Sequence, residues 1–262
     1  TMKTKPKKKI TPKLKFATWN VKTLLDSSRA TSITTPRQTA IVAKELNKYK
    51  VDIAALQETH LKESGQRVEV GEGFSYIWSG CKPEEENYYG VAICIKTKLL
   101  TNNTVSKPVC VSDRLMYVSI AEKGNTTTFI CCHAPTLNSP EQQKTKFYED
   151  LRNIVRNVPN KEKIIIAGDL NARVGSNHNI WKEVMGKHGI GKENANGLLL
   201  LEFCTEMNLK LVNTLFYQKK KYKTTWMHPR SKEWHLIDYF IVKARDVREV
   251  LRCRAMRGAD CD

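Results

Sequence analysis

Acidic and amide side chains stand at the ends of several apolar, strand-like segments of the chain. Six residues share this position: Asn20, Glu58, His133, Asp169, Asn171 and Asp238. A carboxylate that follows a buried strand is held rigidly, which suits the binding of a hard cation through oxygen. Side chains at the ends of neighbouring strands can converge on one cleft, so we expect these residues to form a shared polar site.

The spacing of Asp169 and Asn171 indicates what such a site would do. On an extended stretch, residues two apart point to the same side of the chain. One side chain would position a water or a leaving group, and the other would donate to a phosphoryl oxygen. Structural alternatives exist for single residues: Asn20 is typical of a turn or cap, and Glu58 of a solvated surface. Asp169 after Gly168 is also typical of an Asx turn.

Ten short segments rich in β-branched and aromatic residues predict strands. They are LKFATWN, VDIAALQE, FSYIWSG, GVAICIK, RLMYVSIA, TTTFICCHA, KIIIAGD, LKLVNT, TTWM and LIDYFIV. Several are almost continuously apolar, as in central strands covered on both faces. Helical periodicity appears at Pro36–Tyr49, Ser139–Asn157 and Asn196–Met207. We therefore predict an α+β sandwich in which helices flank two packed sheets.

The N-terminal residues 1–13 differ from the rest in composition. Seven lysines and two prolines fall within the first fifteen residues, which indicates a disordered basic tail. Its KPKKK core would serve as a nuclear-localisation or phosphate-contacting patch, or the tail is merely solvated. Residues 14–262 are predicted to form one domain. No apolar run approaches the roughly 20 residues of a membrane-spanning helix, so no membrane partner is expected.

The net charge of +17 and the pI of about 9.5 favour polyanionic partners. Nucleic acid is the common interpretation, and charge alone leaves an anionic membrane surface or acidic proteins open. The eight cysteines form no CxxC pair, so structural zinc is not expected. Cys94, Cys131 and Cys132 lie inside apolar runs, as buried free thiols do. These thiols indicate a reducing compartment, the nucleus or the cytoplasm.

A lysine-rich stretch, FYQKKKYKTTW, covers Phe216–Trp226. Four lysines alternate with aromatic residues in it: Lys219, Lys220, Lys221 and Lys223. On a hairpin this pattern would combine phosphate contacts with base stacking, so the lysines are candidate DNA-binding residues. The alternative is a solvated hairpin with its aromatic side chains turned inward. The five arginines from Arg245 to Arg257 either extend this basic surface or belong to an ordinary helix face and edge strand.

Several of these segments together resemble a known family. The succession TWNVKTL, ALQETHLK, GVAICIK, HAPT, IIIAGDLNARVG, TTWMHPRS, HLIDYFIV and RGADCD is similar to the endonuclease/exonuclease/phosphatase superfamily. Within it, the chain resembles the endonuclease domains of RTE-type LINE retrotransposons and their host-encoded relatives. The match runs from about Lys15 to Asp262. It implies a four-layer sandwich of two mainly antiparallel β-sheets flanked by helices, with DNA as partner and Mg²⁺ (alternatively Mn²⁺) as cofactor.

The resemblance also implies roles for individual residues. Glu58 matches the family's metal-binding glutamate, and Asn20 matches the asparagine beside the metal. Asp169 matches the aspartate that positions the nucleophilic water or the leaving oxygen. Asn171 matches the asparagine that steadies the scissile phosphate.

Two further matches and one departure complete the implied site. Thr225 matches a threonine in the family's DNA-contacting strand, and Asp238 matches the carboxylate that orients the catalytic histidine. His133 stands where relatives commonly carry a tyrosine that points at the phosphate. An imidazole also donates hydrogen bonds to anions, so the role is expected to persist with altered pH dependence. The alternative is that His133 only packs beside Pro135.

A second departure concerns the C-terminal end. Family members carry a Ser-Asp-His or Thr-Asp-His triplet shortly after the Gly-Ala-Asp that Gly258-Ala259-Asp260 matches, whereas this sequence stops at Asp262. We therefore expect a truncated domain that binds DNA but nicks it poorly, and neither His60 nor His235 is obviously placed to act as a substitute base. Thr1 ahead of Met2 likewise indicates a fragment of a longer reading frame.

These observations lead to one principal functional hypothesis and several alternatives. The chain is interpreted as a Mg²⁺-dependent DNA endonuclease domain of a LINE-type retroelement or of a domesticated relative, monomeric and nuclear. The first alternative is a non-catalytic nucleic-acid-binding module, and the second is an abasic-site repair nuclease. A lipid or inositol phosphatase is disfavoured, because the charge of +17 and the lysine-rich stretch indicate a polymeric substrate.

Overall fold

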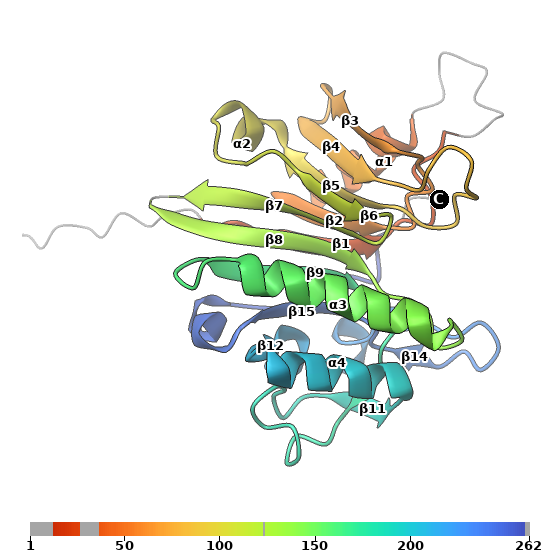
Figure 1. Ribbon diagram of the computed structural model, residues 1–262, viewed down its shortest axis with the longest axis vertical. Coiled ribbons are helices and arrows are strands. Elements are labelled where there is room, and N and C mark those ends of the chain that lie inside the picture. The colour runs from red at the N-terminus through yellow and green to blue at the C-terminus, as the bar shows by residue number, and fades with distance from the viewer. Residues whose placement is uncertain (1–12, 27–36, 123, 260–262) are drawn as a thin grey trace, which may run out of the picture.

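The computed structural model describes residues 13–26, 37–122 and 124–259. Apart from Lys13, the predicted basic tail lies outside these residues, as do Pro36 and Asp260. Within them, the strands form two large sheets that pack face to face, as Figure 1 shows. The predicted four-layer α+β sandwich is thereby confirmed.

The first sheet has five strands in the order β1-β2-β5-β4-β3. They are β1 (Phe16–Asn20), β2 (Ile53–Gln57), β5 (Val91–Lys96), β4 (Phe74–Ser79) and β3 (Ser64–Glu69). β1 and β2 run parallel, and the other neighbouring strands run antiparallel. β2 is buried along its whole length, because alternate side chains face a helix on one side and the second sheet on the other.

The second sheet has six strands in the order β12-β15-β9-β8-β7-β6. They are β12 (Leu209–Leu211), β15 (Asp238–Lys243), β9 (Lys163–Asp169), β8 (Asn125–His133), β7 (Leu115–Glu122) and β6 (Val109–Ser112). β8 and β9 are parallel, and the other pairs are antiparallel. A parallel pair needs a crossover connection, which the long helix α3 (Glu141–Asn157) provides.

Helices cover both outer faces of the sandwich (Figure 1). The other helices are α1 (Gln38–Lys48), the short α2 (Thr97–Thr101) and α4 (Ala195–Glu206). α1 packs on the first sheet through Val42 and Leu46, whereas α3 and α4 pack on the second. The three predicted long helices are therefore present: α1 and α3 are slightly shorter than predicted, and α4 has the predicted length but begins and ends one residue earlier. Among the described residues, no helix is long and apolar enough to cross a membrane.

The central core lies between the two sheets. Ile53, Ala55 and Ile93 from the first sheet meet Met116 and Phe129 from the second, and all five are almost completely buried. Full burial of each large apolar side chain contributes on the order of 1.5–3 kcal/mol. This packing explains the nearly continuous apolar runs in the sequence, and it holds the ends of the strands of both sheets in fixed positions.

Two expectations about local structure are wrong. The lysine-rich stretch does not form a hairpin: residues Lys220–Tyr222 make a 3-10 turn, stabilised by a bond from the Thr224 hydroxyl to the Lys220 carbonyl. The hairpin lies further on, between β13 (Trp226–Met227) and β14 (Trp234–His235). The strand predicted over LKLVNT ends at Leu211 and continues as a 3-10 turn.

Some elements carry no clear sequence pattern. β3 and β6 are edge strands with exposed residues on one or both faces, so their sequences lack the continuous apolar character of the central strands. A second small ribbon pairs β10 (Val174–Gly175) with β11 (Ile190–Glu193). A final 3-10 turn, Ala244–Glu249, leads into an irregular C-terminal stretch.

Candidate active site

One end of the second sheet carries a row of four polar residues, three on the adjacent strands β15, β9 and β8 and one in the turn just before β7. Asp238 lies opposite Asp169, and Asp169 lies opposite His133. The His133 amide donates to the Arg114 carbonyl at 2.9 Å, which places Arg114 next in line. Residues directly opposite each other share a face of the sheet, and these four share the face of Ala167 and Cys131, toward the first sheet. We call Asp238, Asp169, His133 and Arg114 the polar row.

The row depends on a close approach of backbone at Gly168. A Cβ atom there would lie 1.8 Å from the carbonyl oxygen of Cys132 on β8. Any other residue would push β9 away from β8 just before Asp169. The glycine of the GDLN segment therefore allows Asp169 and His133 to lie side by side.

The first sheet contributes Glu58 and Asn20 from across the interface. They follow or end the parallel strands β2 and β1, whose last residues are paired. The Asn20 side-chain amide donates to Glu58 Oε1 at 2.7 Å, and its Oδ1 accepts from the Lys22 backbone N–H at 3.1 Å. Glu58 has a φ of 56°, a left-handed conformation that turns its side chain out of the strand. Its carboxylate is one-third exposed.

Asn171 does not lie on an extended stretch, so the conformation from which we predicted a shared direction for Asp169 and Asn171 is absent. Asn171 has a φ of 47°. The Asp169 carboxylate accepts the Asn171 backbone N–H at 2.8 Å, which is an Asx turn. The Asn171 side-chain amide donates to the Ala134 carbonyl at 2.9 Å, and the Asn196 amide donates to the Asn171 carbonyl at 3.0 Å. Asn171 is thus fixed beside the row by both its backbone and its side chain.

The two aspartates of the row are buried and electrostatically linked. Burial raises the pKa of Asp169 well above its usual range, and the negative charge of Asp238 raises it further. Hydrogen bonds from the Asn171 backbone and the Asn20 side chain act in the opposite direction. Burial raises the pKa of Asp238 to about 6, against a hydrogen bond with Thr225. The pair therefore retains a proton toward neutral pH, as two neighbouring buried carboxyls do.

His133 is buried and neutral. Burial lowers its pKa to about 3, and the nearby charge of Arg114 contributes. Its Nε2 lies 3.8 Å from Glu58 Oε1, which is too long for a hydrogen bond, and its Nδ1 has no partner among the described residues. The ring of Tyr89 packs edge-on against the imidazole, with centroids 6.0 Å apart. If His133 donates a hydrogen bond to an anion, as predicted from the sequence, the donor would be a neutral imidazole.

Thr225 and the lysines take up different positions around the row. The Thr225 hydroxyl accepts the backbone N–H groups of Ile237 and Asp238 at 3.2 and 3.3 Å, so it fixes the start of β15. Lys219, Lys220 and Lys221 are exposed and form no ion pair within the described part of the chain; we call them the lysine segment. Lys223 is half-buried and donates to the His188 carbonyl at 2.9 Å, so the structure separates it from the other three.

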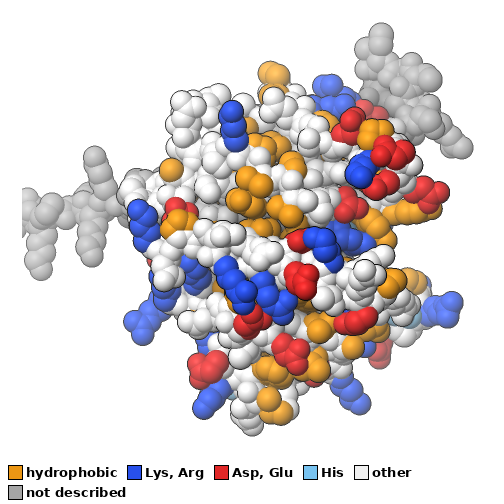
Figure 2. All heavy atoms as spheres, in the orientation of Figure 1, with side chains coloured by type: hydrophobic (Ala, Val, Ile, Leu, Met, Phe, Trp, Pro, Cys, Tyr) orange, Lys and Arg blue, Asp and Glu red, His pale blue; other side chains and the backbone are white. Residues whose placement is uncertain are grey.

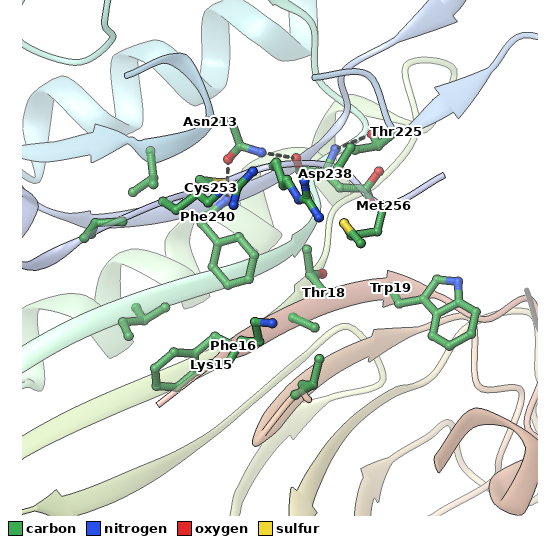
Figure 3. A pocket seen from close by; sticks show the side chains of 18 of the residues that line it. Lys15, Phe16, Thr18, Trp19, Asn213, Thr225, Asp238, Phe240, Cys253 and Met256 are labelled. Atoms are coloured by element: carbon green, nitrogen blue, oxygen red, sulfur yellow. Dashed lines mark hydrogen bonds between the residues drawn. The ribbon is translucent and has the colours of Figure 1, made fainter. Parts of the chain in front are cut away.

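A trench of about 1610 Å³ opens beside β1 and β15, and its lining includes only part of the site. Asn20, Glu58, Asp169 and Asp238 line one end of it, and Figure 3 shows Phe16, Thr18 and Phe240 along the trench. The opposite wall is the irregular stretch from Leu251 to Arg257, shown by Cys253 and Met256 in Figure 3. The sequence did not indicate this wall, because its residues follow no strand or helix periodicity.

Two other neighbours of the site escaped the sequence analysis. Asn213 bridges β15 like a strand partner: its amide donates to the Asp238 carbonyl at 3.2 Å and accepts the Phe240 N–H at 2.8 Å (Figure 3). The Arg114 guanidinium lies 3.6 Å from the centre of the Tyr89 ring, next to His133. Neither residue has a pattern in a single sequence that distinguishes it from an ordinary loop residue.

The donor set fits one kind of metal ion. Within residues 13–26, 37–122 and 124–259, no three His, Cys, Asp or Glu side chains converge on one point. A closed protein site, such as that of structural zinc, is therefore not formed by these residues. Mg²⁺ keeps several waters and takes one or two carboxylates together with phosphate oxygens of the substrate. The accessible Glu58 carboxylate, with two raised-pKa carboxyls behind it, suits such a partly hydrated cation.

Known sequences share this organisation over most of the chain. A family model described as the endonuclease/exonuclease/phosphatase family matches residues 17–253. Craniofacial development protein 2 of Bos taurus is 30% identical over 246 residues, which cover 94% of this chain and 38% of that protein. The chain therefore spans about two fifths of the length of such a relative.

Solved structures share the fold at low sequence identity. The AP endonuclease LMAP from Leishmania major has a TM-score of 0.62 and 16% identity, over 95% of this chain and 84% of that one. The 3′ phosphatase NExo from Neisseria, bound to a product DNA hairpin, has a TM-score of 0.59 and 18% identity, over 90% and 89%. The endonuclease domain of the non-LTR retrotransposon TRAS1 has a TM-score of 0.54 and 15% identity, over 80% of this chain and 81% of that one. With its sandwich fold and its matching sequence, the chain belongs to the endonuclease/exonuclease/phosphatase family.

Proposed function

We propose that this chain is a Mg²⁺-dependent endonuclease that hydrolyses phosphodiester bonds in DNA. The observation that carries the proposal is the pair of buried carboxyls, Asp169 and Asp238, behind the accessible carboxylate of Glu58 at the end of the trench. This arrangement offers a place for a cation and, next to it, a proton that can move. Phosphoryl transfer to water uses both. Membership of a family of nucleases and phosphatases supports the hydrolase class.

Each residue has a distinct part in this proposal. Glu58, with Asn20 beside it, would hold Mg²⁺, which offsets charge on the phosphoryl oxygens when it is bound. As water attacks phosphorus and the bond to the leaving oxygen breaks, the water gives up a proton and the leaving oxygen takes one. The Asp169–Asp238 pair can accept the first or donate the second, because it holds a proton near neutral pH. The second N–H of the Asn171 amide remains available for a phosphate oxygen.

The surface around the site supports a nucleic acid as the substrate. The chain has a net charge of +17, and the lysine segment lies close in sequence to Thr225, at the end of the trench. Trp226 and Met227 on the β13–β14 hairpin are both 39% exposed, which offers a flat apolar surface for a base. A small soluble phosphate ester would need neither of these features. DNA is proposed because the matched motifs are those of DNA endonucleases.

The wider setting belongs to the same proposal. Similarity of the quoted motifs to LINE endonuclease domains supports an origin in a retroelement or in a host relative, and a DNA substrate supports a nuclear location. The whole relative is more than twice as long as this chain, so these statements concern the domain alone.

A plasmid-nicking assay tests the proposal. Supercoiled DNA is incubated with the protein in Mg²⁺, in Mn²⁺ and in EDTA, beside an Asp169→Asn variant as control. We expect slow conversion to the open circle with a divalent cation only, and still slower conversion by the variant. Binding of the plasmid without any metal-dependent nicking would instead support a non-catalytic nucleic-acid-binding module. A preference of at least tenfold for plasmids with abasic sites would point to a repair nuclease.

A further inference from the structure

Two arginines near the site are stacked flat on aromatic rings. The Arg114 guanidinium carbon lies 3.6 Å from the centre of the Tyr89 ring, and the Arg257 guanidinium carbon lies 3.6 Å from the centre of the Trp234 ring. Such stacking holds a guanidinium in one plane, so its N–H groups are directed before any ligand arrives. Each pair connects segments that are distant in the sequence.

Both arginines keep donors to spare. Arg114 donates one hydrogen bond, to the His133 carbonyl at 3.3 Å. Arg257 donates only to Thr224, through the backbone carbonyl at 3.3 Å and through the hydroxyl. Most guanidinium N–H groups of both residues therefore have no acceptor among the described residues. The residue before Arg114 is Asp113, whose carboxyl is half-buried. The charge of Arg114 lowers the pKa of this carboxyl against the larger effect of burial, but the two side chains form no ion pair.

Several other arginines among the described residues are paired with acids, and those that are not lack a ring stacked as closely as the rings on Arg114 and Arg257. Arg152 and Arg156 bind Glu206 at 2.7 and 2.6 Å, and Arg37 binds Glu69 at 3.4 Å. Arg114 and Arg257 form no ion pair within the described part of the chain. A preorganised guanidinium without a carboxylate partner is suited to bind an external anion, and its fork matches two oxygens of a phosphate.

The two stacks stand at opposite ends of the polar row. Arg114 is the last member of the row, at the start of β7. Arg257 lies beyond Asp238, because it binds Thr224, whose neighbour Thr225 binds the start of β15. Neighbouring strands are about 4.8 Å apart, so Arg114 is on the order of 10 Å from Asp169 along the row. About three nucleotides of one DNA strand span such a distance, at roughly 3.4 Å each.

We infer that Arg114 and Arg257 bind phosphates of the substrate strand on opposite sides of the one that is cut, about three nucleotides from it in the case of Arg114, so that the strand runs along the polar row. The strand would cross the ends of β7, β8, β9 and β15 with the scissile phosphate over Glu58 and Asp169. This inference rests on the proposed function for the position of the cut, but not for the binding itself. It assigns an anion-binding role to Arg114, which no sequence pattern marks, and to Arg257, one of the five arginines that the sequence offers as an extension of the basic surface.

Salt titration of DNA binding in EDTA tests the two contacts without any need for hydrolysis. Log affinity is expected to fall with log salt concentration, with about 0.9 in slope for each neutralised phosphate. Arg114→Gln and Arg257→Gln should each flatten the slope by about that amount and weaken binding by about tenfold at moderate salt. The double variant should flatten it by roughly twice as much. Arg156→Gln, which removes the same charge from the outer helix α3, is the control and should leave the slope unchanged.

A second pair of variants separates charge from preorganisation. Tyr89→Leu and Trp234→Leu remove the rings but keep both arginines. We expect a salt slope like that of the wild type with an affinity lower by a few fold, because the guanidinium groups must then be ordered on binding. Thermal unfolding of each variant verifies that it is folded. A wild-type slope in both arginine variants, or an equal loss in Arg156→Gln, would overturn the inference.

Nicking then tests the direction of the strand. Duplexes that carry a single neutral methylphosphonate near the cut are compared for wild type and variants. Arg114→Gln should lose the effect of a neutral group on one side of the cut, and Arg257→Gln on the other. Loss at the same position in both variants would contradict the path along the row. Changed salt slopes together with absent nicking would refute the proposed endonuclease and leave the two anion contacts standing.

Discussion

The polar row and the lysine segment lie near the same trench but are built in opposite ways. Asp169 and Asp238 are buried, held by hydrogen bonds, and shifted in pKa by burial and by each other. The lysine segment is exposed, and its side chains form no ion pair within the described part of the chain. Figure 2, which shows the face of α3, has blue and red side chains mixed rather than a single basic field.

This difference separates what chemistry requires from what binding requires. A proton-holding carboxyl pair acts only in a fixed geometry, so it is placed on strand ends inside a packed core. Attraction of a polyanion needs charge but no single geometry, so it can reside on a surface turn. Changes in the carboxyl groups of the site should therefore alter rate and metal dependence, and changes in the lysine segment should alter affinity and salt dependence.

Among the variants that test this difference, we expect Glu58→Gln to have the largest effect, on the Mg²⁺ dependence of nicking. The amide still accepts the hydrogen bond from Asn20, so the fold should persist, but a neutral oxygen is a weaker ligand for Mg²⁺. The Mg²⁺ concentration for half-maximal nicking should rise at least about tenfold. Glu122→Gln, an exposed residue at the far end of the trench, is the matched control and should behave as wild type. Unchanged Mg²⁺ dependence in Glu58→Gln would remove Glu58 from the metal site.

A middle-sized effect concerns stability and pH. The pKa of Asp238 is raised to about 6. The stability that this raised pKa adds to the folded state is therefore fully present below pH 3.8, the usual pKa of an aspartate, and is lost as the pH rises through 6. Between pH 4 and 7 the free energy of unfolding should fall on this account by on the order of 1–3 kcal/mol. Asp238→Asn should remove that fall, measured as the difference between the two stability curves.

His133 acts in the opposite sense over the same range. The pKa of His133 is lowered to about 3. The stability that the lowered pKa adds to the folded state is therefore present above pH 6.5, the usual pKa of a histidine, and is lost as the pH falls toward 3. The raw curve of the wild type therefore mixes opposite trends, and the difference curve reports Asp238 together with its effect on the pKa of Asp169. Glu84→Gln, at an exposed residue of the surface, is the control. A difference curve that is flat from pH 4 to 7 would show that Asp238 titrates as an ordinary carboxyl.

The smallest effect is expected from the lysine segment. Replacing Lys219, Lys220 and Lys221 together by serine should flatten the salt slope of DNA binding by up to about 0.9 for each lost contact. The nicking rate at saturating protein should stay within about twofold of the wild type. A triple change of Lys44, Lys48 and Lys50 beside α1 serves as the control. An equal change of slope in both triple variants would show a general charge effect rather than a local contact.

Much of the fold follows from the sequence because the central strands are apolar on both faces. The segments VDIAALQE and KIIIAGD are predicted as buried strands from their apolar residues, and they form β2 and β9. Their last residues, Glu58 and Asp169, lie in the site as expected. The edge strands β3 and β6 were missed because partly exposed strands carry no continuous apolar pattern. The lysine-rich stretch was assigned to a hairpin because alternating aromatic residues also occur in turns that are closed by local hydrogen bonds.

The site was predictable in its members but not in its geometry. Spacing alone suggested a common direction for Asp169 and Asn171, yet the left-handed conformation of Asn171 folds the aspartate back onto its own backbone. Arg114 could not be found, and Arg257 only as one of five arginines of an open interpretation, since a stacked arginine without an acid partner differs from a solvated one only through contacts distant in sequence. The geometry of Asp169 and Asn171 and the stacking of the two arginines both depend on how distant segments pair, which a single sequence does not show.

Single-turnover nicking by Asp169→Asn at saturating protein tests the central claim most directly. Asparagine keeps the size of the side chain and accepts the Asn171 N–H, but it cannot hold or release the proton of the pair. We expect the rate to fall by about 10²–10⁴-fold with DNA affinity within a few fold of the wild type. A rate equal to that of the wild type at equal DNA occupancy would contradict the assignment of catalysis to the polar row.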